Sequence, residues 1–265
     1  MLVVKLLHPK KREQSLDSNA TKYRALVCGA SKGIGRAIAI ELASRGYSVY
    51  ALARSKEKLE TLRQYGINPI VSDLDQREKL QVDIVPYLPF HILINNSAGP
   101  QSGALLDADL SELQNAFSRH VLSSHMLVQM VLKGMKSVEY GRIVNIISTS
   151  VYEPIPNLGV SNTIRAAMAG WAKTLSRELP AKITINNILP GFTDTDRLAM
   201  LRQKRAEKQG VSESEVLDNW LHQVPEARLA DPKEIAKAVG FLVSEDASYI
   251  RGVSLAVDGG RLRSI

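Results

Sequence analysis

Residues 28–35 of the chain read Cys-Gly-Ala-Ser-Lys-Gly-Ile-Gly, which places glycines at positions 29, 33 and 35. An apolar run, Ala25-Leu-Val27, comes directly before this segment, and apolar residues recur at helical spacing directly after it. The pattern predicts a strand, a tight glycine turn and a helix. In such a turn, backbone N–H groups and the start of a helix can approach a pyrophosphate, so the segment predicts a dinucleotide-binding site.

Apolar strands alternate with amphipathic helices from residue 23 onward. Strands are expected at residues 24–29, 47–52, 68–72, 91–95, 142–147, 183–189 and 254–257. Helices are expected at residues 33–45, 55–64, 75–86, 110–136, 161–178 and 232–243. This alternation predicts an α/β protein with a single Rossmann-like, doubly wound parallel sheet and helices on both of its faces.

The chain contains no proline- or glycine-rich linker, so residues 21–265 are expected to form a single dinucleotide-binding and catalytic domain. Residues 1–20 lack a sustained period and are expected to be a mobile N-terminal extension. The charged residues 196–222 are expected to form an inserted, two-helix substrate lid. Capping patterns predict helix starts at Asp75 with Glu78, at Ser212 with Glu215 and at Asp231 before Pro232.

Composition argues against several kinds of partner and site. The net charge is +7, yet six of the 34 basic residues fall within the first 24, and no basic stripe carries interleaved aromatic residues, so no nucleic-acid partner is expected. A single cysteine, Cys28, excludes an intramolecular disulfide and a cysteine-based metal site, and no metal is expected. Residues 2–7 are too short an apolar run for a signal or a membrane span. A soluble cytoplasmic protein with no membrane partner is therefore expected.

The second expected strand ends in Ala53-Arg54-Ser55, and this end indicates which cofactor is preferred. Enzymes that prefer NAD usually place an acidic residue near this point, where it binds the adenosine ribose hydroxyl. Here the acid position holds Ala53, and the planar guanidinium of Arg54 is suited to a 2′-phosphate. Lys32 in the glycine turn adds a second positive charge. The sequence therefore predicts NADP(H) as the cofactor.

Five further motifs follow the glycine turn in order: Val71-Ser-Asp-Leu74, Ile92-Leu-Ile-Asn-Asn-Ser-Ala-Gly-Pro100, Gly141-Arg-Ile-Val-Asn-Ile-Ile-Ser148, Asn187-Ile-Leu-Pro-Gly-Phe-Thr-Asp-Thr195 and Gly252-Val-Ser-Leu-Ala-Val-Asp-Gly-Gly260. Together they resemble the short-chain dehydrogenase/reductase family, nearest its 3-oxoacyl-carrier-protein reductase branch, over residues 23–260. The resemblance implies that Asp73 contacts the adenine amino group and that the Pro190-Gly191 turn holds the nicotinamide carboxamide. The cofactor-binding residues are then Gly29, Ser31, Lys32, Gly33, Ile34, Gly35, Arg54, Ser55, Asp73, Leu74, Asn95, Asn96, Ala98, Gly99, Arg165, Pro190, Gly191, Thr193 and Thr195.

Members of this family usually reduce carbonyl groups with a serine, a tyrosine, a lysine four residues after the tyrosine, and an asparagine on the preceding helix. Ser148 matches the serine, whereas the other three positions hold Ser161, Arg165 and His120. The hydroxyl of Ser161 is a far weaker acid than a tyrosine. Arg165 can bind the ribose and stabilise an oxyanion, but a guanidinium does not release its proton near neutral pH.

Two side chains and water remain as candidate proton donors. His120 has an ordinary pKa near 6.5, which suits proton transfer at neutral pH, and a buried histidine in the core is the competing interpretation. Tyr152 lies four residues after Ser148, in a loop expected to line the pocket. For Tyr152 the competing interpretation is an aromatic residue of the pocket wall or of an interface.

The sequence therefore predicts an NADP(H)-dependent oxidoreductase that transfers a hydride between nicotinamide and a carbonyl or alcohol, and the resemblance implies 3-oxoacyl thioesters as substrates. Loss of the usual tyrosine and lysine leaves an alternative, an NADP(H)-binding sensor or scaffold with impaired catalysis. The resemblance also implies a homo-oligomer, either a dimer or a tetramer. Basic residues of the expected lid could receive an anionic carrier, although solvated helix faces are the favoured interpretation: Arg197, Arg202, Lys204, Arg205 and Lys208.

Overall fold

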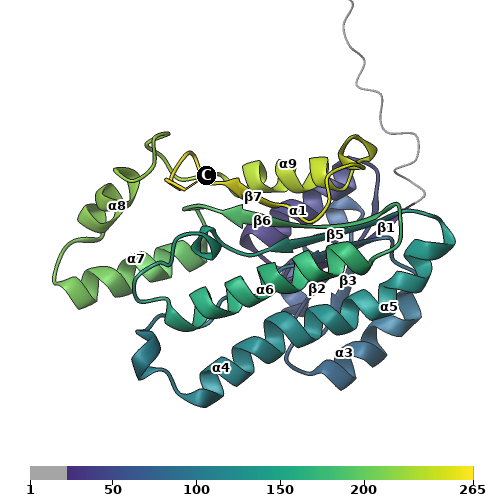
Figure 1. Ribbon diagram of the computed structural model, residues 1–265, viewed down its shortest axis with the longest axis horizontal. Helices are drawn as coiled ribbons and strands as arrows, with labels where there is room; N and C mark the ends of the chain where they lie inside the picture. The colour runs from purple at the N-terminus through teal and green to yellow at the C-terminus, as the bar shows by residue number, and fades with distance from the viewer. Residues whose placement is uncertain (1–22, 265) are drawn as a thin grey trace, which may run out of the picture.

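The computed structural model describes residues 23–264, and the expected extension at residues 1–20 lies outside this range. Seven strands form one sheet with the order β3-β2-β1-β4-β5-β6-β7 (Figure 1). Every neighbouring pair of strands is parallel. The strands are β1 (Arg24–Cys28), β2 (Ser48–Ala53), β3 (Asn68–Val71), β4 (Ile92–Asn95), β5 (Gly141–Ile146), β6 (Ile183–Pro190) and β7 (Ser254–Val257). The predicted fold class is confirmed.

The strand order reverses between β1 and β4. From β1 the chain winds outward through β2 to β3, and it then returns to build β4 to β7 on the other side of β1. In doubly wound sheets, a crevice opens beyond the carboxyl ends of the strands at such a reversal, and ligands bind there. The topology therefore places a binding crevice where the loops after β1 and β4 separate.

Helices cover both faces of the sheet (Figure 1). One face carries α1 (Gly33–Ser44) and α9 (Pro232–Leu242), which pack against each other. The other face carries α3 (Arg77–Ile84), α5 (Ser123–Ser137) and α6 (Gly159–Glu178). Each face buries its own apolar core. Burial on both faces explains why the strands read as continuous apolar runs rather than as alternating ones.

The helix expected at residues 110–136 is interrupted. It consists of α4 (Leu110–Phe117), a π-helical turn at Ser118–Leu122, and then α5. The extra residue in a π turn changes which side chains face inward, and such turns are frequent at functional sites. His120 lies in this turn and is buried. A second difference is α2 (Lys56–Glu60), which ends four residues earlier than expected and is followed by a 3-10 turn.

Two of the three predicted helix starts are confirmed. The hydroxyl of Ser212 accepts a hydrogen bond from the Glu215 backbone at the start of α8 (Glu213–Leu221), and Asp231 caps α9. The prediction for Asp75 is wrong because α3 begins at Arg77 with Gln76 as its cap. The carboxylate of Asp75 instead accepts a hydrogen bond from Arg119 Nε at 2.7 Å.

Residues 196–222 form two helices, as expected: α7 (Asp196–Gln209) and α8. These helices pack against each other and extend from one end of the sheet (Figure 1). Within residues 23–264, no helix has the length and apolar character needed to cross a bilayer. Over the same residues, no group of three histidine, cysteine, aspartate or glutamate side chains is placed to hold a metal ion.

Candidate active site

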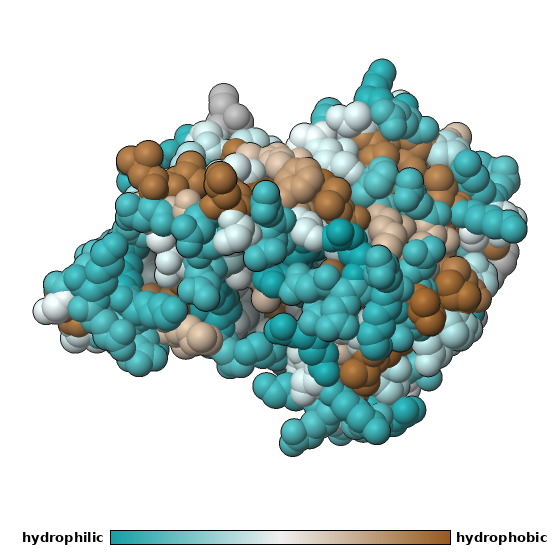
Figure 2. All heavy atoms as spheres, turned by 90° about the horizontal axis from the view of Figure 1, so that it is seen from below, coloured by the Kyte–Doolittle hydropathy of each residue, from teal (hydrophilic) through white to brown (hydrophobic). Residues whose placement is uncertain are grey.

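A cleft of about 760 Å³ lies at the carboxyl ends of the parallel strands. The surface is hollowed between the α7–α8 pair and the rest of the molecule (Figure 2). Residues from the loops after six strands, β1 to β6, and from α2, α6 and α7 line the cleft. The predicted site residues that line it are Gly29, Ser31, Lys32, Gly33, Ile34, Gly35, Arg54, Ser55, Asp73, Leu74, Asn96, Ala98, Gly99, Ser148, Ser161, Arg165, Pro190, Gly191, Thr193 and Thr195. The structure therefore brings together residues that are up to 166 positions apart, from Gly29 to Thr195.

The glycine turn is tightly packed against the loop after β4. Gly29 has a φ of +62°, in the left-handed region that favours glycine, and a β-carbon there would lie 2.5 Å from the Asn96 backbone oxygen. The side-chain amide of Asn96 donates hydrogen bonds to the carbonyls of Cys28 and Gly29. Asn96 therefore holds the turn on the side that faces the loop after β4. The turn also lines the cleft.

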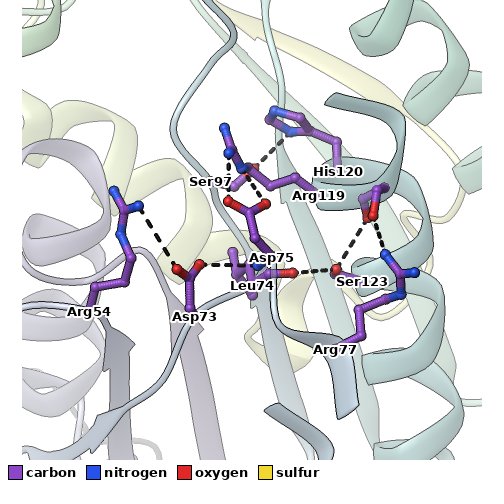
Figure 3. Close-up of polar contacts among 10 residues, drawn as sticks. Arg54, Asp73, Leu74, Asp75, Arg77, Ser97, Arg119, His120 and Ser123 are labelled. Carbon is purple, nitrogen blue, oxygen red and sulfur yellow. Dashed lines mark hydrogen bonds and ion pairs between the residues drawn. The ribbon is translucent and has the colours of Figure 1, made fainter. Parts of the chain in front are cut away.

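Charged side chains surround the end of the cleft near β2 and β3 (Figure 3). The guanidinium of the exposed Arg54 lies 4.0 Å from Asp73, whose carboxylate also accepts a hydrogen bond from the Asp75 backbone. The carboxylate of Asp75 in turn binds Arg119. This arrangement leaves the solvent-facing side of Arg54 available to a 2′-phosphate, and it fixes Asp73 at the edge of the cleft.

The side chains of Ser148, Ser161 and Arg165 all line the same cleft. Ser148 follows β5, and its hydroxyl accepts a hydrogen bond from the Ser150 backbone at 3.1 Å. Ser161 and Arg165 lie one turn apart on α6, so their spacing of four residues places them on one helix face. Arg165 Nη1 donates to the carbonyl of Ile146 at 2.9 Å. This bond directs the guanidinium toward the end of β5, where Ser148 lies.

The guanidinium of Arg165 is buried without a carboxylate partner among residues 23–264. Its side chain is 8% exposed, and its Nε atom has no hydrogen-bond partner within that range. Burial, together with the nearby Arg197, lowers the pKa of Arg165 to about 10. A buried cation of this kind favours a bound group that offers oxygen acceptors or negative charge.

His120 lies behind the cleft rather than on its wall. Its Nδ1 is 2.7 Å from the hydroxyl of Ser97 (Figure 3). His120 and Arg165 both line a small void of about 10 Å³, which is roughly the space that one water needs. Burial, with added repulsion from Arg165 and Arg119, holds the pKa of His120 well below its usual value. His120 is therefore neutral at neutral pH.

Tyr152 and Asn95 do not line the cleft, and both expectations are corrected. Tyr152 is exposed, and its hydroxyl donates to the carbonyl of Ser254 at 3.3 Å, which directs it away from the cleft. Asn95 belongs to a row of amides across the sheet. Its side chain donates to Asn145 at 2.8 Å, and Asn145 donates to Asn187 at the same distance. These amides fasten strands β4, β5 and β6 together, and none of the three lines the cleft.

The structure adds three side chains that were missing from the predicted site. Arg197 reaches the cleft from α7, Arg119 positions Asp75, and Ser97 bonds to His120. Ser97 carried a signal in the sequence, because it interrupts the Asn-Asn-Ala-Gly strand end that is usual in the family, between Asn96 and Ala98. Arg197 was indicated only as one of five basic residues in the expected lid. Nothing in the sequence pattern distinguished Arg119.

Comparisons with known proteins agree with this geometry. The family model described as enoyl-(acyl carrier protein) reductase matches residues 29–261. The 3-oxoacyl-[acyl-carrier-protein] reductase FabG of Haemophilus influenzae is 35% identical over 246 residues, which cover 89% of this chain and 96% of that protein. The NADPH-dependent reductase BacG of Bacillus subtilis is 27% identical, over 92% of this chain and 100% of that protein.

A solved structure also matches closely. It is the L-sorbose reductase from Gluconobacter frateurii complexed with NADPH and L-sorbose, with a TM-score of 0.85 and 25% identity. The match covers 92% of this chain and 97% of that one. The parallel sheet, the glycine turn, the serine after β5 and the family match lead to one assignment: the chain belongs to the short-chain dehydrogenase/reductase family, near its 3-oxoacyl-carrier-protein reductase branch.

Proposed function

We propose that this chain reduces a carbonyl compound with NADPH and that Ser148 and Arg165 stabilise the oxyanion that forms. The enzyme is an NADP-dependent oxidoreductase. The observation that carries the proposal is that Ser148, Ser161 and Arg165 share one cleft with the glycine turn and Arg54. Phosphate-binding and oxyanion-binding groups therefore stand at two ends of a single site, as a dinucleotide-dependent reductase needs.

The residues at the adenosine end suit a phosphorylated dinucleotide. The glycine turn opens a backbone edge to the cleft, and Lys32 and Arg54 stand beside it. When it is bound, the cofactor supplies the hydride. Arg165 takes the position of the family's lysine and lines the cleft, where a guanidinium can donate hydrogen bonds to ribose hydroxyls. These residues bind and orient the cofactor.

At the reacting end, the hydroxyl of Ser148 donates to the substrate oxygen, and the fixed charge of Arg165 stabilises the negative charge that develops there. Neither His120 nor Tyr152 delivers the proton directly, because His120 is buried and neutral and Tyr152 points elsewhere. The proton then comes from water, with the hydroxyl of Ser161 as a hydrogen-bonding relay in the cleft. The arrangement stabilises the alkoxide electrostatically rather than by a strong acid.

The substrate range follows from the relatives as a proposal. The curated relatives include 3-oxoacyl-carrier-protein reductases, so 3-oxoacyl thioesters are the first substrates to test. Helix α7 borders the cleft and α8 packs against α7, and we propose that the two helices act as the substrate lid within a single domain. We also propose a homo-oligomer, which sedimentation equilibrium would test: a species of about 29 kDa alone would contradict it.

The decisive experiment measures NADPH oxidation by the purified protein against 3-oxoacyl thioesters, ketones, aldehydes, oxo acids and quinones. NADPH binding is measured in the same sample. We expect turnover with at least one class, and loss of that turnover in Arg165→Met. Turnover that persists in Arg165→Met would remove Arg165 from the chemistry.

A sensor or scaffold is the second candidate function, and one observation favours it: the tyrosine and lysine of the family are both replaced within the cleft. Tight NADPH binding without turnover on the whole panel would support this candidate. It would also overturn the reductase proposal.

A further inference from the structure

The positive charges that line the cleft differ in whether a carboxylate matches them and in how far they are buried. Three of them are matched by a carboxylate: Lys32 with Asp196, Arg54 with Asp73, and Arg119 with Asp75. The exposed Lys58 stands on α2, at the end of the cleft near Arg54. The other two, Arg165 and Arg197, form no ion pair with any carboxylate that the structure describes. Lys58 also has no carboxylate partner that the structure describes, but it is exposed to solvent, so the unmatched charge that is at least partly buried is concentrated in Arg165 and Arg197.

Arg165 and Arg197 come together beside Gly99. A β-carbon at Gly99 would lie 3.5 Å from Arg165 Nη2 and 3.9 Å from Arg197 Nη2. The two guanidiniums therefore reach the same small space from different helices, α6 and α7. A residue larger than glycine would fill part of this space.

Backbone carbonyls hold both guanidiniums in place. Arg165 Nη1 donates to Ile146 at 2.9 Å, and Arg197 Nη2 donates to Pro100 at 2.5 Å. A carbonyl accepts a hydrogen bond but carries no net charge, so these bonds fix the positions without neutralising either cation. Two partly desolvated like charges repel each other, and burial lowers the pKa of each. An anion between them would relieve this cost.

The phosphates of a dinucleotide have other binding groups. The glycine turn follows β1, and Arg54 follows β2, whereas Arg165 and Arg197 bond to the ends of β5 and to the loop after β4. Ser148 and Ser161 line this second half of the cleft. An anion that reaches Gly99 is therefore next to the groups that act on the substrate.

We propose that Arg165 and Arg197 together bind a carboxylate of the substrate, so that the enzyme acts on oxo acids rather than on neutral carbonyl compounds. This inference rests on the proposed reductase function, and it specifies oxo acids as the substrate class in place of the 3-oxoacyl thioesters that the relatives suggest. Planar guanidinium groups match carboxylates in geometry as well as in charge. Arg197 is then a specificity-determining residue, and Arg165 serves both the anion and the oxyanion.

The test compares each acid with its methyl ester, which keeps the carbonyl and removes the charge. Pyruvate, acetoacetate and levulinate place the carboxylate at increasing distance from the carbonyl. Binding is measured by calorimetry to the complex of the protein with NADP⁺, which cannot reduce the probes. We expect at least one acid to bind about tenfold or more tightly than its ester, the size of a charge-assisted contact.

Arg197→Met removes the charge and retains most of the chain length. In this variant we expect the preference for acid over ester to fall to within about twofold, a difference below 0.5 kcal/mol. Lys204→Met is the matched control, because it removes one positive charge from an exposed position of the same helix away from the cleft. The control should keep the full preference.

Three results would overturn the inference. The first is equal binding of every acid and its ester to the unaltered protein, and the second is a preference that survives in Arg197→Met. The third is a large loss of NADPH affinity in Arg197→Met, which would assign the pair to a cofactor phosphate. Because binding is measured without turnover, a preference for acids in a protein that never oxidises NADPH would refute the reductase while the anion site stands.

Discussion

The ammonium group of Lys32 lies 3.2 Å from a carboxylate oxygen of Asp196, which links the glycine turn to the first residue of α7. Both side chains line the cleft. In the family's cofactor position, Lys32 would face a phosphate, and Asp196 would compete with that phosphate for the same ammonium group. The pair therefore couples the glycine turn to the proposed lid.

Removal of the competing carboxylate should tighten NADPH binding. In Asp196→Asn we expect the Kd for NADPH to fall about two- to fivefold, because an exposed ion pair contributes up to about 1 kcal/mol. Fluorescence titration of NADPH measures this. Asp194→Asn removes an exposed charge two residues earlier, outside the cleft, and should leave the Kd unchanged. A weaker affinity in Asp196→Asn would mean that the ion pair organises the site instead.

Arg54 should determine the choice between the two nicotinamide cofactors. Its guanidinium is exposed, and its ion pair with Asp73 is long at 4.0 Å. The guanidinium can therefore turn to a 2′-phosphate. In Arg54→Ala we expect the Kd for NADPH to rise about tenfold or more, while the Kd for NADH stays within about twofold. Lys56→Ala, an exposed neighbour that does not line the cleft, is the control. Parallel loss of both affinities would show a general structural effect.

Ser148 should act on turnover and not on cofactor binding. Ser148→Ala removes the hydroxyl at the end of β5, and we expect kcat to fall about a hundredfold, as for the loss of one oxyanion donor. The Kd for NADPH should stay within about twofold. Ser150→Ala changes a buried serine of the same turn that does not line the cleft. If Ser150→Ala lowers kcat equally, the turn rather than the hydroxyl of Ser148 is responsible.

His120 should make the protein less stable in acid. Its pKa in the fold lies well below the usual value because it is buried beside Arg165, so below about pH 6.5 the unfolded chain binds a proton that the folded chain does not. The free energy of unfolding should therefore fall with decreasing pH, by up to about 1.4 kcal/mol per pH unit from this group. Denaturant unfolding between pH 7 and 5 measures the slope.

In His120→Gln this contribution to the slope should disappear. His222→Gln alters an exposed histidine at the end of α8 and should retain the slope. A wild-type slope that persists in His120→Gln would contradict the assignment of this histidine as the neutral, buried group.

The amide row across the sheet should contribute to stability. Asn145 is fully buried and bonds to both Asn95 and Asn187. Asn145→Leu leaves the buried amide nitrogen of Asn95 and the buried amide oxygen of Asn187 without their partner, and we expect the free energy of unfolding to fall by about 2–5 kcal/mol. Asn68→Leu, on the exposed side of edge strand β3, should change it by less than about 0.5 kcal/mol. Equal effects would mean that the bonds in the row contribute nothing measurable.

The sequence by itself determined the sheet, the glycine turn and most of the cleft. Periodicity over residues 23–264 is local information, since each strand or helix carries its own apolar pattern and its own caps. The spacing of Ser161 and Arg165 also predicted that they lie together in the fold, because residues four apart share one helix face. The order of motifs along the chain predicted which loops meet, because the carboxyl ends of parallel strands lie along one edge of the sheet.

Only the tertiary structure decided the protonation state of individual polar groups and their hydrogen-bond or ion-pair partners. The π turn carries His120 behind the cleft, Asp75 binds Arg119 instead of capping α3, and Tyr152 bonds to the backbone near β7. The meeting of Arg165 with Arg197 beside Gly99 likewise needs α6, α7 and β4 in place. These outcomes depend on burial and on distances between segments remote in sequence, and those quantities exist only once the chain has folded.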